Sequence, residues 1–517
     1  MEQLDIIILV AYLLVIVGIG IYLSRKESTN AKDYFFASNI LPWWAIGGSL
    51  IASNISAEQF IGMSGSGYVV GLAIASYEWL AALALLLVAK FFLPVFIKNE
   101  IYTMPQFLEK RFDNRVKTGM AIFWLFLFVF VNITSILYLG SLALKTLLGI
   151  PLWLGIIGLV LYSATFSIFG GLKTVVWTDV VQVVVLIIGG IIATIMILNA
   201  IDSNIIEALN QLYHKAPDKF DLILDKSNPE YKNLPGLSVL IGGIWVANLY
   251  YWGTNQYIIQ RSLAAKSLKE AQLGTAFAAL MKLLLPFIVV LPGIAAFVLD
   301  APISKPDEAY PWIINNYVII GFKGLAIAAL IAAIGSSLSS MVNSTSTIFT
   351  LDIYEPFLTK AKENVSQKRL VKVGKMSSAV ALIIGAIVAP LLGNIDQAFQ
   401  FIQEYTGFIS PGVVTIFVLG LFWKKMSSNA ALWSVILSFP FSIFLKFLFP
   451  ELPFMNRIEI VFALCMVASI GISIIESKYE KANYFYNPKG LFNTSLKFNA
   501  LAFTTIGIIT VIYSLFY

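Results

Sequence analysis

The chain has 517 residues, of which 58% are hydrophobic and only 12% are charged, and its formal net charge is +6. A soluble globular protein carries about 25% charged residues, so this composition and the many long apolar runs indicate a helical protein that crosses a membrane many times. One cysteine (Cys465) and one histidine (His214) exclude a disulfide framework, a histidine-dependent nucleophile and a histidine-rich metal site. We therefore do not expect an enzyme.

Fourteen apolar segments follow one another along the chain, and the connections between them leave no room for a soluble domain. The sequence therefore predicts one all-α polytopic transmembrane domain over residues 1–517, with a short surface helix within 201–236. The expected spans are 5–23, 42–62, 69–97, 117–147, 151–170, 174–200, 237–260, 269–299, 318–348, 371–392, 395–423, 428–449, 457–476 and 497–516.

Lysine and arginine are distributed unequally between the two sides of these spans. With the N-terminus outside, 24 of the 35 basic residues fall in inward connections and 8 fall in outward connections or at outer span ends. Cytoplasmic loops are rich in these residues, so we expect both termini outside and no arginine at membrane depth. The positive charge then belongs to the loops and indicates a lipid bilayer, not nucleic acid, as partner.

The second span is poorly suited to face lipid. Residues 42–68 carry Ser53, Asn54, Ser56, Glu58 and Gln59 near the middle, and three glycines follow. Polar groups left unsatisfied in hydrocarbon cost several kcal/mol each. We therefore expect an interrupted helix whose freed carbonyls and polar side chains hold a ligand; a polar helix packed inside a bundle is the alternative.

A second interrupted span is expected five spans later. Segment 237–260 has glycines and a polar centre that includes Asn248, Tyr251 and Thr254. Because five is odd, two consecutive five-span units must have opposite orientations, which favours a secondary transporter built from inverted repeats. The repeats would be 42–200 and 237–425, with a peripheral helix and inner loop in 1–41 and three peripheral helices in 426–517.

Small hydroxyl residues in the ninth span suggest a cation site. Ala333, Ser336 and Ser337 share one helix face, and Ala52 and Ile55 flank the first interruption. Together they offer carbonyl and hydroxyl oxygens, which suit a hard cation such as Na⁺. Close helix packing through small residues is the alternative reading.

Ionisable and amide residues at membrane depth suggest a solute site, because such residues are rare there and usually functional. Amides and carboxylates bind hydroxyls, and aromatic rings stack on the C–H face of a sugar, so this set suits a neutral polyhydroxylated ligand. Asp179 could serve as an ion relay or be a satisfied helix residue. The set is Gln59, Glu78, Asn248, Lys282 and Gln403, with Tyr77, Tyr251 and Trp252 nearby.

Four long strings carry a resemblance to a known family. They are ASNISAEQFIGMSGSGY with SYEW, WVANLYYWGTNQYIIQR, SSLSSMVNSTSTIFTLDIY and FQFIQEYTG. They resemble the solute:sodium symporter family, in particular its sodium/sugar branch, over nearly the whole chain. The resemblance implies the inverted-repeat fold of the leucine-type transporters and alternating access driven by a Na⁺ gradient.

The family's functional residues fall on matching positions. The resemblance implies a sodium site at Ala52, Ile55, Ala333, Ser336 and Ser337, and a sugar site at Gln59, Glu78, Asn248, Lys282 and Gln403. It further implies an inner gate of Tyr251 held by Asn54 with Trp252 beside it, an outer lid of Met63, Tyr77 and Phe399, and a sodium exit path at Asp179.

Two positions depart from the pattern. A serine that contacts the sugar in a family member is Ala81 here, which removes one hydrogen bond, worth about 0.5–1.5 kcal/mol. Ser339 replaces an alanine, and some members bind a second Na⁺ through hydroxyls at this level and an aspartate. Asp179, Ser337, Ser339 and Ser340 would supply that second site, so we expect two Na⁺ per sugar.

The sequence thus predicts a Na⁺-coupled importer of a galactose- or glucose-like monosaccharide in a bacterial inner membrane, with a monomer as the functional unit and a dimer left open. Myo-inositol is the next substrate, and sialate or an amino acid is less favoured because no arginine is expected at membrane depth. A non-transporting receptor and a passive pore are the alternatives from other classes.

Overall fold

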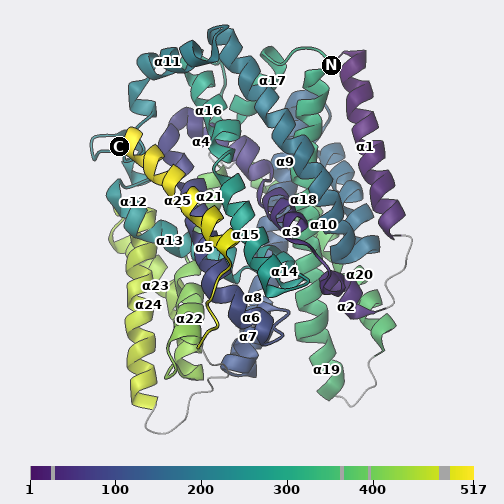
Figure 1. Ribbon diagram of the computed structural model, residues 1–517, viewed down its shortest axis with the longest axis vertical. Helices are drawn as coiled ribbons and strands as arrows, with labels where there is room; N and C mark the ends of the chain where they lie inside the picture. Colours follow the sequence, from purple (N-terminus) through teal and green to yellow (C-terminus); the bar gives the residue numbers. More distant parts are fainter. Residues whose placement is uncertain (1, 25–29, 361–365, 394–397, 477–488) are drawn as a thin grey trace.

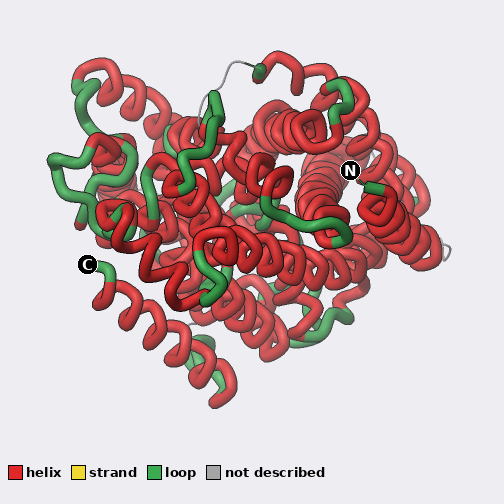
Figure 2. The backbone as a smooth tube through the Cα atoms, turned by 90° about the horizontal axis from the view of Figure 1, so that it is seen from above, coloured by secondary structure: helices red, strands yellow, loops and turns green. Residues whose placement is uncertain are grey.

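The computed structural model describes residues 2–24, 30–360, 366–393, 398–476 and 489–517, and these residues are helical almost throughout (Figure 1). Within these ranges the β pairing consists of one isolated bridge between Leu41 and Ala265. Figure 2 shows the helices packed side by side around a densely filled centre.

The α-helices, in chain order, are α1 (Gln3–Ser24), α2 (Ala31–Phe36), α3 (Trp43–Asn54), α4 (Ser64–Val69), α5 (Ser76–Leu87), α6 (Leu93–Lys98), α7 (Met104–Arg111), α8 (Asn114–Phe126), α9 (Thr134–Leu148), α10 (Leu152–Ile201), α11 (Ile205–Lys215), α12 (Leu237–Ile241), α13 (Gly243–Leu249), α14 (Gln256–Leu263), α15 (Leu268–Lys282), α16 (Leu285–Val298), α17 (Ala309–Asn316), α18 (Phe322–Ile348), α19 (Glu355–Lys360), α20 (Gln367–Val388), α21 (Ala398–Thr406), α22 (Ser410–Phe422), α23 (Ser428–Leu448), α24 (Phe454–Glu476) and α25 (Leu496–Leu515).

The described part of the chain has ten helices that are long and apolar enough to cross a membrane, or eleven if the pair 229–241 and 243–254, bent by 78°, counts as one span. The protein is therefore an all-helical, multi-pass membrane protein. The count of fourteen stays a prediction, because α10 contains two of the predicted spans in 50 residues and α3 has only 12 residues.

Gly171 divides α10 into two helical arms. Its backbone is non-helical, with φ +60° and ψ −167°, and a Cβ atom there would lie 2.4 Å from the carbonyl oxygen of Tyr34. Glycine alone tolerates this conformation and this close approach. The predicted spans 151–170 and 174–200 are therefore two arms that meet at one glycine.

Both predicted interruptions are present. Helix α3 ends at Asn54, Ile55 is extended (φ −74°, ψ 108°), and a π-helical segment, Glu58–Met63, leads into α4. Helix α13 leads into a π-helical segment, Tyr250–Thr254, then extended Asn255 (φ −84°, ψ 119°), then α14. In each case an extended residue leaves backbone carbonyls without helical partners.

Helix α18 forms the centre of the bundle, where it packs against α10, α3, α14, α9 and α20 (Figure 1). In the most apolar stretch of the α18–α19 span 94% of the residues are buried, against 17% for α1 and for α25. This difference marks α1 and α25 as peripheral. The chain ends both lie in the upper half of Figure 1.

Segment 201–236 contains the short surface helix that the sequence predicts. Helix α11 covers Ile205–Lys215, with His214 in its last turn. It lies at the top of the molecule in Figure 1, away from the interruptions of α3 and α13. The one histidine of the chain is therefore remote from the interrupted helices.

Candidate functional site

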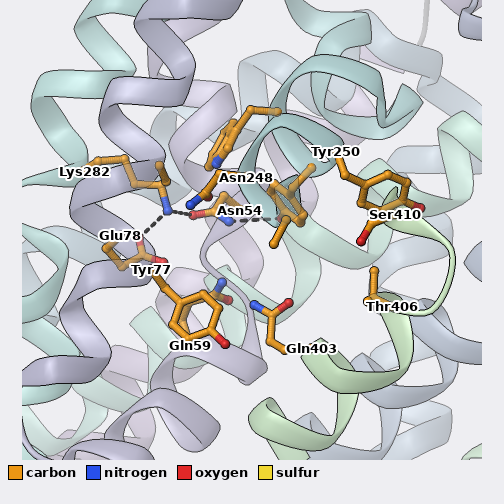
Figure 3. A pocket seen from close by; sticks show the side chains of 15 residues that line it. Asn54, Gln59, Tyr77, Glu78, Asn248, Tyr250, Lys282, Gln403, Thr406 and Ser410 are labelled. Atoms are coloured by element: carbon orange, nitrogen blue, oxygen red, sulfur yellow. Dashed lines mark hydrogen bonds and ion pairs between the residues drawn. The ribbon is translucent and has the colours of Figure 1, made fainter. Parts of the chain in front are cut away.

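A polar pocket lies where the two interrupted helices meet (Figure 3). It has an empty volume of about 530 Å³, part of which is open solvent. All six residues predicted to bind the solute line it: Gln59, Glu78, Asn248, Tyr251, Lys282 and Gln403.

A buried ion pair occupies one wall of this pocket. Lys282 Nζ, at the end of α15, donates hydrogen bonds to Glu78 of α5 and to the side-chain oxygen of Asn54 (Figure 3). The same ammonium group lies 4.9 Å from the ring centroid of Trp252. The two opposite charges cancel, and each keeps hydrogen-bonding capacity for a ligand. The wall is therefore polar but electrically neutral.

Tyr251 connects the two interrupted helices. Its hydroxyl accepts a hydrogen bond of 3.0 Å from Asn54 Nδ2. Its ring centroid lies 5.0 Å from that of Trp252 and 5.6 Å from that of Tyr257, edge to face in both cases. Asn54 therefore contacts both Tyr251 and Lys282, so this single amide ties the aromatic group to the ion pair.

Two amide groups are left with unused donors. Gln59 Oε1 accepts from the backbone N–H of Ser56 at 3.0 Å and from its hydroxyl at 2.9 Å, which leaves the amide nitrogen of Gln59 for a ligand. Asn248 Nδ2 is buried and has no hydrogen-bond partner among the described residues. Because a buried, unpaired donor costs about 1–3 kcal/mol, a ligand with acceptor oxygens would stabilise this pocket.

The predicted gate and lid residues divide into three groups. Tyr77 of the lid and Trp252 of the inner gate line the pocket, as does Ala81, so the departure from the family's serine lies within the site. Met63 is fully buried and is not part of the pocket lining, and its place in a lid stays a prediction. The side chain of Phe399 lies outside the described residues.

The predicted sodium ligands come together where α18 passes the end of α3. Ser337 Oγ donates to the carbonyl oxygens of Ser53 at 2.9 Å and of Ile55 at 3.2 Å. Ala52 and Ala333 are fully buried on the same two helices. The freed carbonyl of Ile55 and the hydroxyl of Ser337 are thus neighbours, as a site of neutral oxygen ligands requires. Ser336 differs, because its hydroxyl donates to Asp179 at 2.6 Å.

Asp179 of α10 is the centre of a second buried polar cluster. Its carboxylate accepts hydrogen bonds from Ser49 at 2.5 Å, from Ser53 at 3.2 Å and from Ser336 at 2.6 Å. Ser340 belongs to the same cluster through a contact of 2.9 Å with Ser53. Asp179 is therefore fully hydrogen-bonded in this conformation.

Ser339, also predicted to contribute to a second sodium site, points elsewhere. Its hydroxyl donates to the Gly335 carbonyl at 2.7 Å and lies 3.2 Å from the hydroxyl of Ser163, on the other arm of α10. Of the four predicted second-site residues, Asp179, Ser337 and Ser340 thus share a network through Ser53, and Ser339 is not part of it.

Arg261 is the principal residue that the sequence misplaces. The charge pattern assigns it to a cytoplasmic connection, but its side chain is fully buried on α14 and faces Asp179 at 3.5 Å. It also donates to Ser49 Oγ at 2.8 Å and to Ser340. The placement of Arg261 among the loop charges is therefore wrong, because side-chain length lets a residue at the end of α14 reach inward.

Glu58 has a partner that its position in the sequence does not indicate. Its carboxylate accepts a hydrogen bond of 2.7 Å from Ser135 Oγ of α9. It does not line the polar pocket. Glu58 therefore joins the outer part of the first interrupted helix to α9.

Two oppositely directed, interrupted helices around a buried polar pocket define a secondary transporter. The sequence model of the Sodium:solute symporter family matches residues 34–438, and the chain belongs to this family. It is therefore a transporter and not an enzyme, and Na⁺ is its coupling ion.

Relatives with known names extend this comparison. The chain is 49% identical to the sodium/glucose cotransporter of Vibrio parahaemolyticus over 99% of this chain and 98% of that protein. It is 32% identical to the sodium/myo-inositol cotransporter 2 of the rabbit, Oryctolagus cuniculus, over 84% and 69% of the two chains.

The fold matches that of a Na⁺-coupled sialic acid symporter solved in a substrate-bound, outward-open state. The TM-score is 0.81 at 26% identity, and 93% of this chain and 99% of that chain are covered. The nucleobase-cation symporter Mhp1 shares the fold with a TM-score of 0.54 at 15% identity, over 87% and 96% of the two chains.

Proposed function

We propose that the protein imports a neutral, galactose- or glucose-like monosaccharide together with Na⁺ by alternating access. The observation that carries the proposal is the neutral polar wall formed by Glu78 and Lys282, together with the unpartnered amide of Asn248 in the same pocket lining. Sugar hydroxyls both donate and accept hydrogen bonds, so they can satisfy carboxylate, ammonium and amide groups at once. The name of the Vibrio relative supports a sugar.

Myo-inositol is the second candidate. It is a neutral polyol that carries the same kind of hydroxyls, and a 32% identical relative is a myo-inositol cotransporter. Sialate is less favoured although the sialic acid symporter shares the fold. An acid needs a cation that is available to its carboxylate, and Lys282, the lysine in the pocket lining, is already paired with Glu78.

Coupling between ion and solute follows from two adjacent residues: Asn54, the last residue of α3, and Ile55, which follows it. The Ile55 carbonyl faces Ser337, and the Asn54 side chain contacts Lys282 and Tyr251. A sodium ion at Ala52, Ile55, Ala333, Ser336 and Ser337 would therefore order the same turn that positions the solute pocket. By linkage, each ligand then raises the affinity for the other by the same factor.

We also propose how the chain is arranged in the membrane. Fourteen spans would contain inverted repeats at 42–200 and 237–425, both termini would lie outside, and the monomer would transport in a bacterial inner membrane. A second Na⁺ at Asp179, Ser337, Ser339 and Ser340 would require Ser339 to turn away from Ser163. A reversal-potential measurement distinguishes the stoichiometries, and one charge per sugar would contradict a second ion.

Uptake into proteoliposomes tests the substrate. Labelled galactose, glucose, myo-inositol, proline and sialate are compared with an inward Na⁺ gradient and with choline in its place. We expect Na⁺-dependent uptake of galactose or glucose. Uptake of proline or sialate without uptake of either sugar would overturn the proposal, and sugar flux that is unchanged in choline would indicate a passive pore.

A further inference from the structure

Two cavities adjoin on the side of the molecule, along α8. The first has an empty volume of about 790 Å³ and includes Asn114, Thr118 and Asp352 in its lining. The second lies between α8 and α20, has about 830 Å³ and includes Phe126, Val129, Phe130, Val380 and Ile384 in its lining. Phe349 lines both cavities, and we call the two together the α8–α20 groove.

One end of the α8–α20 groove is polar and contains an incompletely satisfied carboxylate. Asp352 is 3% exposed, and its Oδ1 accepts a hydrogen bond of 3.0 Å from Thr103. Its second oxygen, Oδ2, is buried and has no hydrogen-bond partner among the described residues. A buried carboxylate oxygen without a donor is costly, which indicates a ligand that brings an N–H or O–H group.

The charges around Asp352 are mostly negative, so a bound cation would be stabilised there. Lys117 forms an ion pair of 2.6 Å with Glu109 and is the lysine that interacts electrostatically with Asp352 and Glu355. One ammonium group thus faces three carboxylates. No group of three or more acidic, histidine or cysteine residues in the described part of the chain could hold a metal ion. An organic ammonium group fits this charge better than a chelated metal.

The rest of the α8–α20 groove is apolar and opens sideways. Phe126 is 58% and Val380 is 48% exposed, although both lie on segments that cross the membrane. Along α8 and the π-helix that follows it, Asn114 and Phe130 are separated by about 24 Å at 1.5 Å per residue. One leaflet of hydrocarbon measures about 15 Å, half of a core of about 30 Å. The groove therefore has the length of a headgroup followed by an acyl chain.

We propose that the α8–α20 groove binds one phospholipid with a primary-amine headgroup, namely phosphatidylethanolamine. Its ammonium group would donate to Asp352 Oδ2, and one acyl chain would lie beside Phe126, Val129 and Val380. A choline headgroup has the same charge but no N–H to donate, and a glycerol headgroup has no cation. The headgroup preference therefore follows from the unpaired oxygen.

Native mass spectrometry of the full-length protein tests this proposal. Purified protein is mixed with equal amounts of dioleoyl phosphatidylethanolamine, phosphatidylcholine and phosphatidylglycerol in detergent. We expect one retained lipid, predominantly phosphatidylethanolamine, and at least a fivefold loss of that preference in Asp352→Asn. Asp300→Asn, in an outer turn, is the matched control. Equal retention of the three lipids, or an unchanged preference in Asp352→Asn, would overturn the proposal.

Two further experiments test separately whether the groove is the binding site and whether its ligand is a lipid. Val380→Trp fills the lipid-facing mouth and should reduce phosphatidylethanolamine retention several-fold, whereas Val467→Trp, at an exposed position of α24 outside the groove, should not. If both tryptophan variants retain lipid as the wild type does, the groove is not the binding site. If water-soluble glycerophosphoethanolamine displaces the lipid at equal concentration, the site binds amines and not a lipid.

Discussion

The two interrupted helices run in opposite directions, yet they present the same order of structure across the bundle. The start of α3 lies beside the end of α14, where the Leu41 N–H donates to the Ala264 carbonyl at 3.2 Å. From that shared end, each helix has a regular α-helix, then one extended residue, Ile55 or Asn255, and then a π-helical segment. The two interruptions therefore show the same order of backbone conformations from this shared end, although the chain runs through them in opposite directions.

The side chains around the two interruptions are not repeated. The Ile55 carbonyl accepts from Ser337 of α18, and the neighbouring Asn54 contacts Tyr251 and Lys282. The side-chain oxygen of Asn255, by contrast, is buried without a hydrogen-bond partner among the described residues. Similar geometry therefore carries different side chains, and under the proposed function we expect ion and solute to meet at the first interruption and the second to supply aromatic and amide groups to the solute alone.

Loss of the pocket's polar groups should have the largest effect. In Glu78→Ala the ammonium of Lys282 loses its buried counter-charge, a change that costs about 3–5 kcal/mol, so we expect sugar affinity to fall at least a hundredfold. Gln59→Ala should also abolish measurable binding. Equilibrium binding of labelled sugar at saturating Na⁺ measures both, with size-exclusion profiles to establish folding. Near-normal sugar affinity in Glu78→Ala would mean that the Glu78–Lys282 pair does not contribute to sugar binding.

The ion side of the first interruption is tested by Ser337→Ala. The loss of one hydroxyl next to the Ile55 carbonyl should raise the Na⁺ concentration for half-maximal uptake about tenfold, equivalent to about 1.4 kcal/mol. Thr415→Ala on α22, whose hydroxyl donates only to the Pro411 carbonyl within its own helix, is the control. Wild-type Na⁺ dependence in Ser337→Ala would contradict the sodium assignment.

The link between the two interruptions is tested at Tyr251. Tyr251→Phe keeps the ring and removes the hydrogen bond to Asn54, worth about 0.5–1.5 kcal/mol, so uptake should fall only a few-fold. Tyr251→Ala removes the ring as well and should impair transport more. Initial rates over a range of sugar concentrations separate the two variants. Equal defects would mean that the hydroxyl, not the ring, carries the function.

The smallest effect on transport is expected from a substitution at the second interruption. Asn255→Ala removes a side-chain oxygen that has no partner, so uptake and Na⁺ dependence should stay within about twofold of the wild type. Asn54→Ala, next to the extended Ile55 of the first interruption, should be much more damaging because two contacts are lost. If Asn255→Ala were equally damaging, the two interruptions would be functionally alike.

The interruptions and the pocket could be predicted because their polar residues stand out within apolar segments. Asn54, Gln59 and Asn248 have no use on a lipid-facing helix, and the resemblance to the family assigned them to a common site. Ser337 was recognisable because it shares a helix face with Ala333. The sequence thus locates the site where polar residues lie close together within an otherwise apolar segment.

Partners far apart in the sequence could not be predicted. Glu58 pairs with Ser135, and Arg261 with Asp179, across distances that no periodicity encodes. The burial of Arg261 depends on how α14 packs against α3 and α18. The count of fourteen spans stays a prediction: hydropathy marks two segments in α10, and the non-helical backbone at Gly171 lies between them.

The pairing of Arg261 with Asp179 has an electrical consequence. The Asp179 cluster is neutral before any sodium ion arrives, because the Arg261 guanidinium already balances the carboxylate. A sodium ion that moved to Asp179 would repel that guanidinium, and any displacement of it across the membrane field is worth about 2.3 kcal/mol per elementary charge per 100 mV. Membrane voltage would then act on the arginine as well as on the ion. The steady-state current, and the charge movement measured without sugar, would both depend on Arg261, which need not touch the ion or the sugar.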